Sequence, residues 1–182
     1  MNSDLTVLIT GESGTGKELI AKALHEFGNR KDSTFVPINM AAIPKDLIES
    51  ELFGHEKGAF TGAVKQKIGQ VEEANEGTLF LDEIGEMSRS LQAKLLRFLE
   101  DGTFVRVGGT EEQKVNVRIV AATNRDIIEA IEEGEFREDL YHRLNVVQMR
   151  VVPLRDRRED VVILAEHFLA KFGRKMSKFF EP

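Results

Sequence analysis

A glycine-rich segment followed by a lysine has the clearest chemistry in this sequence. Gly11 and Gly16 are separated by four residues, and Lys17 comes directly after them. Glycines let successive backbone N–H groups turn inward around phosphate oxygens, and the lysine adds a positive charge at a helix N-terminus. The spacing is typical of a P-loop, and its strand–loop–helix setting argues against the alternative, a chance glycine turn. The predicted phosphate-binding residues are Gly11, Glu12, Ser13, Gly14, Thr15, Gly16, Lys17 and Glu18.

The position after Lys17 departs from the general motif. A P-loop usually has Ser or Thr there, whose hydroxyl binds magnesium, whereas this chain has Glu18. Two alternatives stay open: the Glu18 carboxylate holds the ion through water, or the Thr15 hydroxyl contributes. The metal contact is therefore less defined than the phosphate cradle.

Two carboxylates, Asp82 and Glu83, follow the apolar run of residues 79–81. Carboxylates at the end of a buried strand need a partner, because desolvating each charge costs several kcal/mol. A divalent cation, Mg²⁺, suits Asp82, and Glu83 is then placed to polarise a water that attacks a γ-phosphate. The alternative is a solvated turn, since the same loop continues through Gly85 and Glu86.

Strands and helices alternate along the chain. Buried apolar runs predict strands at residues 6–10, 35–39, 78–81, 117–122 and 146–151, and a hairpin at 104–114. Helical spacing predicts helices at residues 19–27, 44–53, 90–102, 127–134 and 138–144, and a last one after Pro153 that closes at Gly173. Ser90 is the expected cap of the helix at 90–102. The alternation predicts an α/β fold, a three-layer αβα sandwich with a central parallel sheet. The glycine turn, Asp82, Glu83 and Asn124 then meet beyond the carboxyl ends of the strands.

Composition narrows the function classes. Of 182 residues, 25 are Lys or Arg and 31 are Asp or Glu, so the net charge of −6 argues against a generally basic nucleic-acid binder. The chain has no cysteine, which excludes thiol catalysis, disulfides and Cys-based zinc sites. No apolar run approaches the ~20 residues of a membrane helix, and the first residues do not form a signal peptide. We expect a cytoplasmic protein with no membrane partner.

With these residues in place, the chain resembles the AAA+ ATPase domain of bacterial sigma-54-dependent transcription activators, of the nitrogen-regulatory-protein-C type. Residues 11–18 match the family's Walker A motif, including Glu18, and residues 77–83 match its Walker B motif. The most specific match is the family's GAFTGA loop, which other AAA+ families lack. Its residues here are Gly58, Ala59, Phe60, Thr61, Gly62 and Ala63. The similarity extends from about residue 6 to about residue 172.

The resemblance implies ATP and Mg²⁺ as cofactors, ATP hydrolysis as the activity, and a P-loop NTPase core. It implies a hexameric or heptameric homo-oligomeric ring that remodels the closed complex of sigma-54 RNA polymerase. Asn39 resembles the residue that holds the Walker B glutamate away from its water, and Asn124 matches the sensor of the γ-phosphate. Phe60 and Thr61 would contact sigma-54, although a phenylalanine by itself is more often buried.

Arg137 and Arg143 match arginines that the family projects into a neighbouring subunit's nucleotide site. From residue types alone, an alternative role stays open for both arginines: Arg137 could form an ion pair with Glu138 or Asp139, and Arg143 one with Glu138.

The expected division is an AAA+ core at residues 1–154 and the start of a helical lid at residues 155–182. Compared with the family, the sequence lacks an adenine-contacting segment, most of the lid and any DNA-binding domain, so we expect weak ATPase activity and DNA contact only through a domain absent here. Two other functions stay open: another P-loop remodeller that acts on nucleic acid, and a nucleotide-binding assembly module without turnover.

Overall fold

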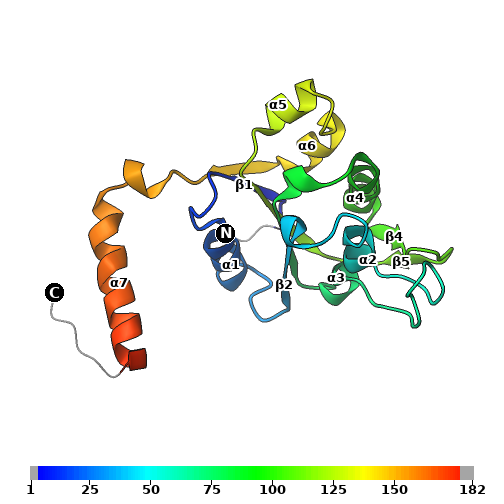
Figure 1. Cartoon of the computed structure of the whole chain (residues 1–182), viewed down its shortest axis with the longest axis horizontal. Helices are drawn as coiled ribbons and strands as arrows, with labels where there is room; N and C mark the ends of the chain where they lie inside the picture. The colour runs from blue at the N-terminus through cyan, green and yellow to red at the C-terminus, as the bar shows by residue number, and fades with distance from the viewer. Residues whose placement is uncertain (1–3, 177–182) are drawn as a thin grey trace.

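The sheet that organises the molecule contains five parallel strands in the order β2-β3-β6-β1-β7. The computed structural model describes residues 4–176 (Figure 1). A separate antiparallel hairpin is formed by β4 and β5. The strands are β1 Val7–Thr10, β2 Phe35–Asn39, β3 Thr78–Asp82, β4 Thr103–Val105, β5 Glu112–Lys114, β6 Arg118–Thr123 and β7 Val147–Arg150.

Helices cover both faces of the sheet. Along β1, Val7 and Ile9 pack with Ala21 of α1, whereas Leu8 belongs to the larger core on the opposite face, because side chains alternate along a strand. That larger core contains side chains from α2 to α6. The α-helices are α1 Lys17–Glu26, α2 Ile48–Phe53, α3 Gln70–Glu73, α4 Arg89–Asp101, α5 Ile127–Glu132, α6 Glu138–Leu144 and α7 Glu159–Met176. The predicted three-layer αβα sandwich is confirmed.

Three predicted helix ends are wrong by a few residues. The cap of α4 is Ser88 rather than Ser90, and its side chain accepts the Leu91 N–H at 3.3 Å. Helix α2 begins at Ile48, because Pro44 closes only a preceding turn. Helix α7 continues past Gly173, since a glycine within a helix costs only ~1 kcal/mol.

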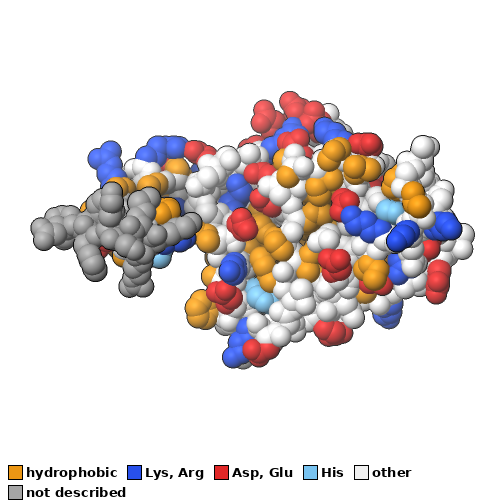
Figure 2. Space-filling view, turned by 60° about the horizontal axis from the view of Figure 1, so that its bottom comes forward, with side chains coloured by type: hydrophobic (Ala, Val, Ile, Leu, Met, Phe, Trp, Pro, Cys, Tyr) orange, Lys and Arg blue, Asp and Glu red, His pale blue; other side chains and the backbone are white. Residues whose placement is uncertain are grey.

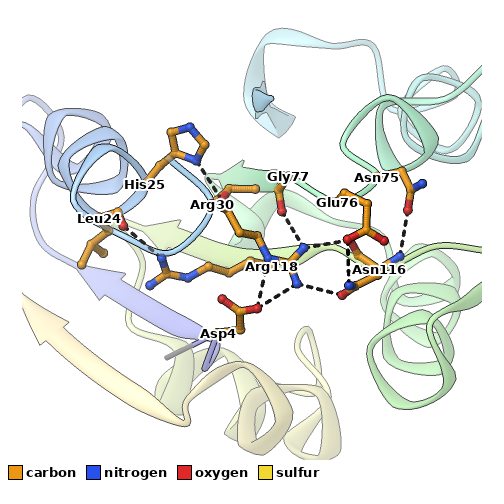
Figure 3. Close-up of polar contacts among 10 residues, drawn as sticks. Asp4, Leu24, His25, Arg30, Asn75, Glu76, Gly77, Asn116 and Arg118 are labelled. Atoms are coloured by element: carbon orange, nitrogen blue, oxygen red, sulfur yellow. Dashed lines mark hydrogen bonds and ion pairs between the residues drawn. The ribbon is translucent and has the colours of Figure 1, made fainter. Parts of the chain in front are cut away.

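A polar cluster joins α1 to the amino-terminal edge of the sheet (Figure 3). Arg118, which begins β6, is 3% exposed and donates to the Leu24 carbonyl of α1 at 3.0 Å. Next to it, His25 hydrogen-bonds Thr78 of β3 at 3.0 Å. Burial lowers the pKa of His25 and also that of Arg118. The C-terminal end of α1 is therefore fastened to β3 and β6, at the edge opposite the glycine-rich loop.

Helix α7 stands away from the sheet, on the side of the molecule where α1 lies (Figure 1). It follows β7 through a connector that contains the 3₁₀ helix η3 (Leu154–Asp156). Figure 2 shows hydrophobic side chains on this projecting arm, and the exposed ones include Val162 and Ile163. Nothing in residues 4–176 is a helix both long and apolar enough to span a membrane.

Candidate functional site

The glycine-rich loop leaves the carboxyl end of β1 and runs into α1. Gly11 starts it by donating its N–H to the Thr123 carbonyl of β6 at 3.3 Å. Gly14 and Gly16 have φ of +80° and +94°, which L-residues rarely adopt, so both positions need glycine. Gly16 is also the N-cap of α1, and the loop therefore delivers its amides to the positive end of the helix dipole.

Lys17 is buried under this loop, with 6% of its surface exposed. Its Nζ donates to the carbonyls of Gly11 and Glu12, at 3.0 and 3.2 Å, and lies 3.6 Å from a carboxylate oxygen of Glu83. The ammonium thus has acceptors within the chain, and a bound phosphate would compete with them for it.

Asp82 ends β3 at the same edge. It accepts from the Asn39 side chain at 2.9 Å and from the Glu83 N–H at 3.1 Å. Burial, together with the neighbouring Glu83 charge, raises the pKa of Asp82. When the surroundings of a carboxylate disfavour its negative charge, a divalent cation can compensate that charge. Asp82 therefore fits the predicted Mg²⁺ contact.

Glu83 has an unusual backbone for a residue with a side chain. Its φ and ψ are +56° and +49°, in the left-handed region, a conformation that clusters at functional sites. Its Oε2 accepts the backbone N–H of Asn124, just beyond β6, at 3.0 Å. The structure therefore brings together the glycine-rich loop, Asp82, Glu83 and Asn124, as the order of strands predicts.

Asn39 has a different partner from the one the resemblance implies. Its side-chain NH₂ donates to Asp82, not to Glu83. Its side-chain oxygen accepts the N–H groups of Ala41 and Ala42, at 2.9 and 3.2 Å, and so caps the 3₁₀ helix η1 (Met40–Ala42). Asn39 is paired with Asp82 in the sheet register, which places the two side chains side by side.

The two candidate finger arginines lie on or next to α6, and both have partners within the chain. Arg137 pairs with Asp139, with nitrogen–oxygen distances of 3.0 and 2.6 Å, and this pair lowers the pKa of Asp139. Arg143 donates to the Leu99 carbonyl of α4 at 2.8 and 3.1 Å, rather than to Glu138.

The hydrogen bonds do not decide whether Glu18 or the Thr15 hydroxyl would contribute to the metal contact. The Thr15 hydroxyl donates to the Glu12 carbonyl at 2.8 Å, and Glu18 is exposed in the first turn of α1.

The segment 58–63 forms a closed turn. The Gly58 N–H donates to the Ala63 carbonyl at 2.8 Å, and the Ala63 N–H donates to the Phe60 carbonyl at 3.0 Å. Phe60 is 38% exposed, and its ring contacts the His55 ring edge-to-face with centroids 5.0 Å apart. Phe60 is therefore neither buried in the core nor fully free.

The β4–β5 hairpin supports this turn. Val107 exchanges backbone hydrogen bonds with Gly54 and Glu56, at 2.9 and 3.0 Å. Arg106, whose side chain is 11% exposed, pairs with Glu56 at 3.0 Å and Glu72 at 2.8 Å.

Gly108 has no room for a side chain, because an added Cβ would lie 2.6 Å from Ala59 Cβ. The position of the turn thus depends on the hairpin.

Sequence reasoning missed the ion pairs of Arg106 and the contacts of two arginines in the β7–α7 connector. Arg155 pairs with Glu12, and Arg157 donates to the Thr15 carbonyl at 3.0 Å. Their partners are distant in sequence, by 34 to 143 residues. The one local signal is the position of Arg155 and Arg157, which come shortly after Pro153, where the last strand has just ended at the site's edge.

The fold and the loop define a P-loop NTPase domain. The solved structure of NtrX from Brucella abortus in complex with ADP superposes with a TM-score of 0.90 at 43% identity, covering 96% of this chain and 38% of that one. Its complex with ATP has a TM-score of 0.86 at 44% identity, covering 94% and 38%. The family model of the sigma-54 interaction domain matches residues 1–150, and the chain belongs to that family.

Among curated relatives, NtrC of Rhizobium meliloti is 61% identical over 169 residues, which are 93% of this chain and 35% of the relative. The chain therefore spans about a third of the length of the relatives it matches. The family predicted from the Walker and GAFTGA segments is confirmed.

Proposed function

We propose that this domain hydrolyses ATP to ADP and phosphate with Mg²⁺, and uses the cycle to remodel a sigma-54 RNA polymerase complex. The observation that carries the proposal is the convergence of the glycine-rich loop, Lys17, the Asp82–Glu83 pair and Asn124 at one edge of the sheet. The nucleotide complexes of the similar NtrX protein support ATP as the ligand.

Each residue has a separate task. The inward N–H groups of the loop and the Lys17 ammonium hold the β- and γ-phosphates. Asp82 would ligate Mg²⁺, which shields phosphate charge when bound. Glu83 would orient the attacking water and accept its proton, and Asn124 would sense the γ-phosphate. Before that step, the Glu83 carboxylate must break its hydrogen bond with the Asn124 N–H, or rotate while keeping it.

Arg137 and Arg143 act on a neighbouring copy in this proposal. Arg137 must exchange Asp139 for phosphate oxygens, and Arg143 must leave the Leu99 carbonyl. Such fingers contribute about 10³ to 10⁵ in rate. Turnover therefore depends on assembly into a ring of subunits.

Asn39 offers a path from the site to the turn 58–63, the segment proposed to contact sigma-54. It holds Asp82 with its NH₂ and the start of η1 with its oxygen, and η1 leads through α2 into the segment 58–63. A change at Asp82 on cation binding is passed along this path. Phe60 and Thr61 then contact sigma-54 once the ring has organised the loops.

The core and lid division belongs to the same proposal. We place the core at residues 1–154, ending after β7, and the start of a helical lid at residues 155–182, which contain α7. Residues 177–182 lie outside the described part of the chain.

Phosphate release, measured across protein concentration, tests the proposal. Turnover per chain should rise with concentration because the fingers act between copies. Lys17→Ala should lose nucleotide binding, whereas Glu83→Gln should bind ATP and release no phosphate. ATP-analogue-dependent capture of sigma-54 then tests the partner.

Two outcomes would replace the proposal. ATP binding without phosphate release at any concentration would indicate an assembly module. Turnover stimulated by DNA, without sigma-54 capture, would indicate a remodeller of nucleic acid.

A further inference from the structure

The connector between β7 and α7 contacts the glycine-rich loop at three of its residues. At the loop's start, Gly11 packs on the Val151 backbone, where an added Cβ would lie 2.6 Å from the Val151 carbonyl oxygen. Arg155 donates from both terminal nitrogens to the two carboxylate oxygens of Glu12. At the loop's end, Arg157 donates to the Thr15 carbonyl at 3.0 Å.

Arg157 also reaches α7. Its other terminal nitrogen lies 3.4 Å from the Asp160 carboxylate in the first turn of that helix. The guanidinium therefore bridges the glycine-rich loop and α7, and its Nε is buried without a hydrogen-bond partner within the described residues. A planar guanidinium fixes the relative direction of its two partners in a way that a flexible ammonium does not.

The loop's contact points are the ones that a phosphate would disturb. Lys17 holds the Gly11 and Glu12 carbonyls, and it must release at least one of them to reach a phosphate. The Thr15 carbonyl lies between Gly14 and Gly16, both with positive φ, so its peptide unit turns with little resistance when the neighbouring amides close on an anion.

We propose that Arg155 and Arg157 are positioning residues that transmit the occupancy of the glycine-rich loop to α7. The inference rests on the proposed nucleotide binding and adds the route by which it is sensed. Phosphate binding reorients the Glu12 and Thr15 backbone, the two arginines follow, and α7 changes its angle to the core through Asp160. No contact between α7 and the nucleotide is required. The exposed Arg155–Glu12 pair contributes little free energy, so it mainly orients the connector. Arg157 is expected to contribute more to the coupling.

Spin labels on α1 and α7 test this directly, because the chain has no cysteine of its own. Lys22→Cys and Glu166→Cys place labels at exposed positions on the two helices. Pulsed dipolar spectroscopy then reports the distance between the labels without nucleotide, with ADP and with AMPPNP, and a fluorescent ADP titration measures binding in the same samples. In the labelled parent, nucleotide should shift the distance distribution.

Two variants should remove the shift while nucleotide binding stays within about threefold of the parent, since neither side chain holds the nucleotide. Arg157→Gln breaks the bridge at the loop, and Asp160→Asn weakens it at α7 without touching the loop. Asp160→Asn also keeps the test valid if Arg157→Gln folds poorly. Arg158→Gln, an exposed neighbour, is the matched control and should respond like the parent.

An unchanged shift in both variants would overturn the inference. So would a parent that binds ADP with no change in the distance distribution. A parent that binds no nucleotide at all would overturn the proposed function, and the inference with it.

Discussion

Substituting Gly108 by alanine tests whether the β4–β5 hairpin sets the position of the turn 58–63. The new Cβ would lie 2.6 Å from Ala59 Cβ and 2.9 Å from Ala59 Cα. Ala59 must therefore move by roughly 0.8 Å before the two methyl groups are in ordinary contact at 3.4 Å. Because the neighbour includes backbone, the turn as a whole must shift.

Gly134 provides a matched control. Its φ is +74°, the same as that of Gly108, but an added Cβ would meet nothing within 4 Å. Gly134→Ala thus carries only the cost of a left-handed alanine, about 1–2 kcal/mol. Gly108→Ala carries that cost and the overpacking, about 1 kcal/mol more, at the low end of the usual range because a surface turn gives way more easily than a core.

Urea denaturation of both variants measures the difference in unfolding free energy, and an open-complex assay with sigma-54 RNA polymerase measures the functional effect. We expect Gly108→Ala to keep ATP turnover and to lose most of its activation, whereas Gly134→Ala keeps both. Combining Gly108→Ala with Ala59→Gly removes the closer contact and should recover part of the stability. Equal unfolding free energies for the two single variants, within about 0.5 kcal/mol, would refute the reasoning.

Three further predictions follow from the site and its surroundings. Phe60→Ala should change stability by less than about 1 kcal/mol, because the ring is 38% exposed and lies outside the core, against His55. It should leave phosphate release intact and abolish open-complex formation. Asp82→Asn should raise the melting temperature of the nucleotide-free chain at pH 7–8, because the folded state raises the pKa of Asp82 and so disfavours its charged form; a lower melting temperature would contradict this. His25 has a lowered folded pKa, so the unfolded chain takes up a proton first, and stability should fall as the pH drops below about 6.5. His25→Gln should flatten that profile in melts from pH 7.5 to 5.5, and a profile as steep as the parent's would contradict this.

The sheet, and the edge at which the candidate site residues meet, were predictable because their signals are local. Each central strand is a short apolar run, and the polar residues that follow it must meet once the strands are parallel. Asp82 and Asn124 could therefore be placed at one edge without knowing a single distance. Helix ends were less predictable, because Ser88 and Ser90 are both good caps and packing selects between them.

Long-range pairings could not be predicted from this sequence. Arg106 is one of many arginines, and nothing near it in the chain indicates that Glu56 and Glu72 are its partners. Arg157 meets Thr15 across 142 residues. The Asn39 NH₂ hydrogen-bonds Asp82 and not Glu83, and residue types alone do not show which of the two adjacent carboxylates it reaches.

Contacts within the chain satisfy the charged groups of the candidate site unevenly, and this affects how a phosphate and a cation would bind there. Lys17 already has two carbonyls and the Glu83 carboxylate, so a phosphate that captures it exchanges one set of partners for another. Asp82 also has partners, the Asn39 NH₂ and the Glu83 N–H, yet burial and the Glu83 charge still raise its pKa. If Asp82 holds the cation as proposed, we expect nucleotide to bind more tightly with Mg²⁺ than alone. Because Asn39 hydrogen-bonds both Asp82 and η1, cation binding in that proposal is also the step that Asn39 connects to η1.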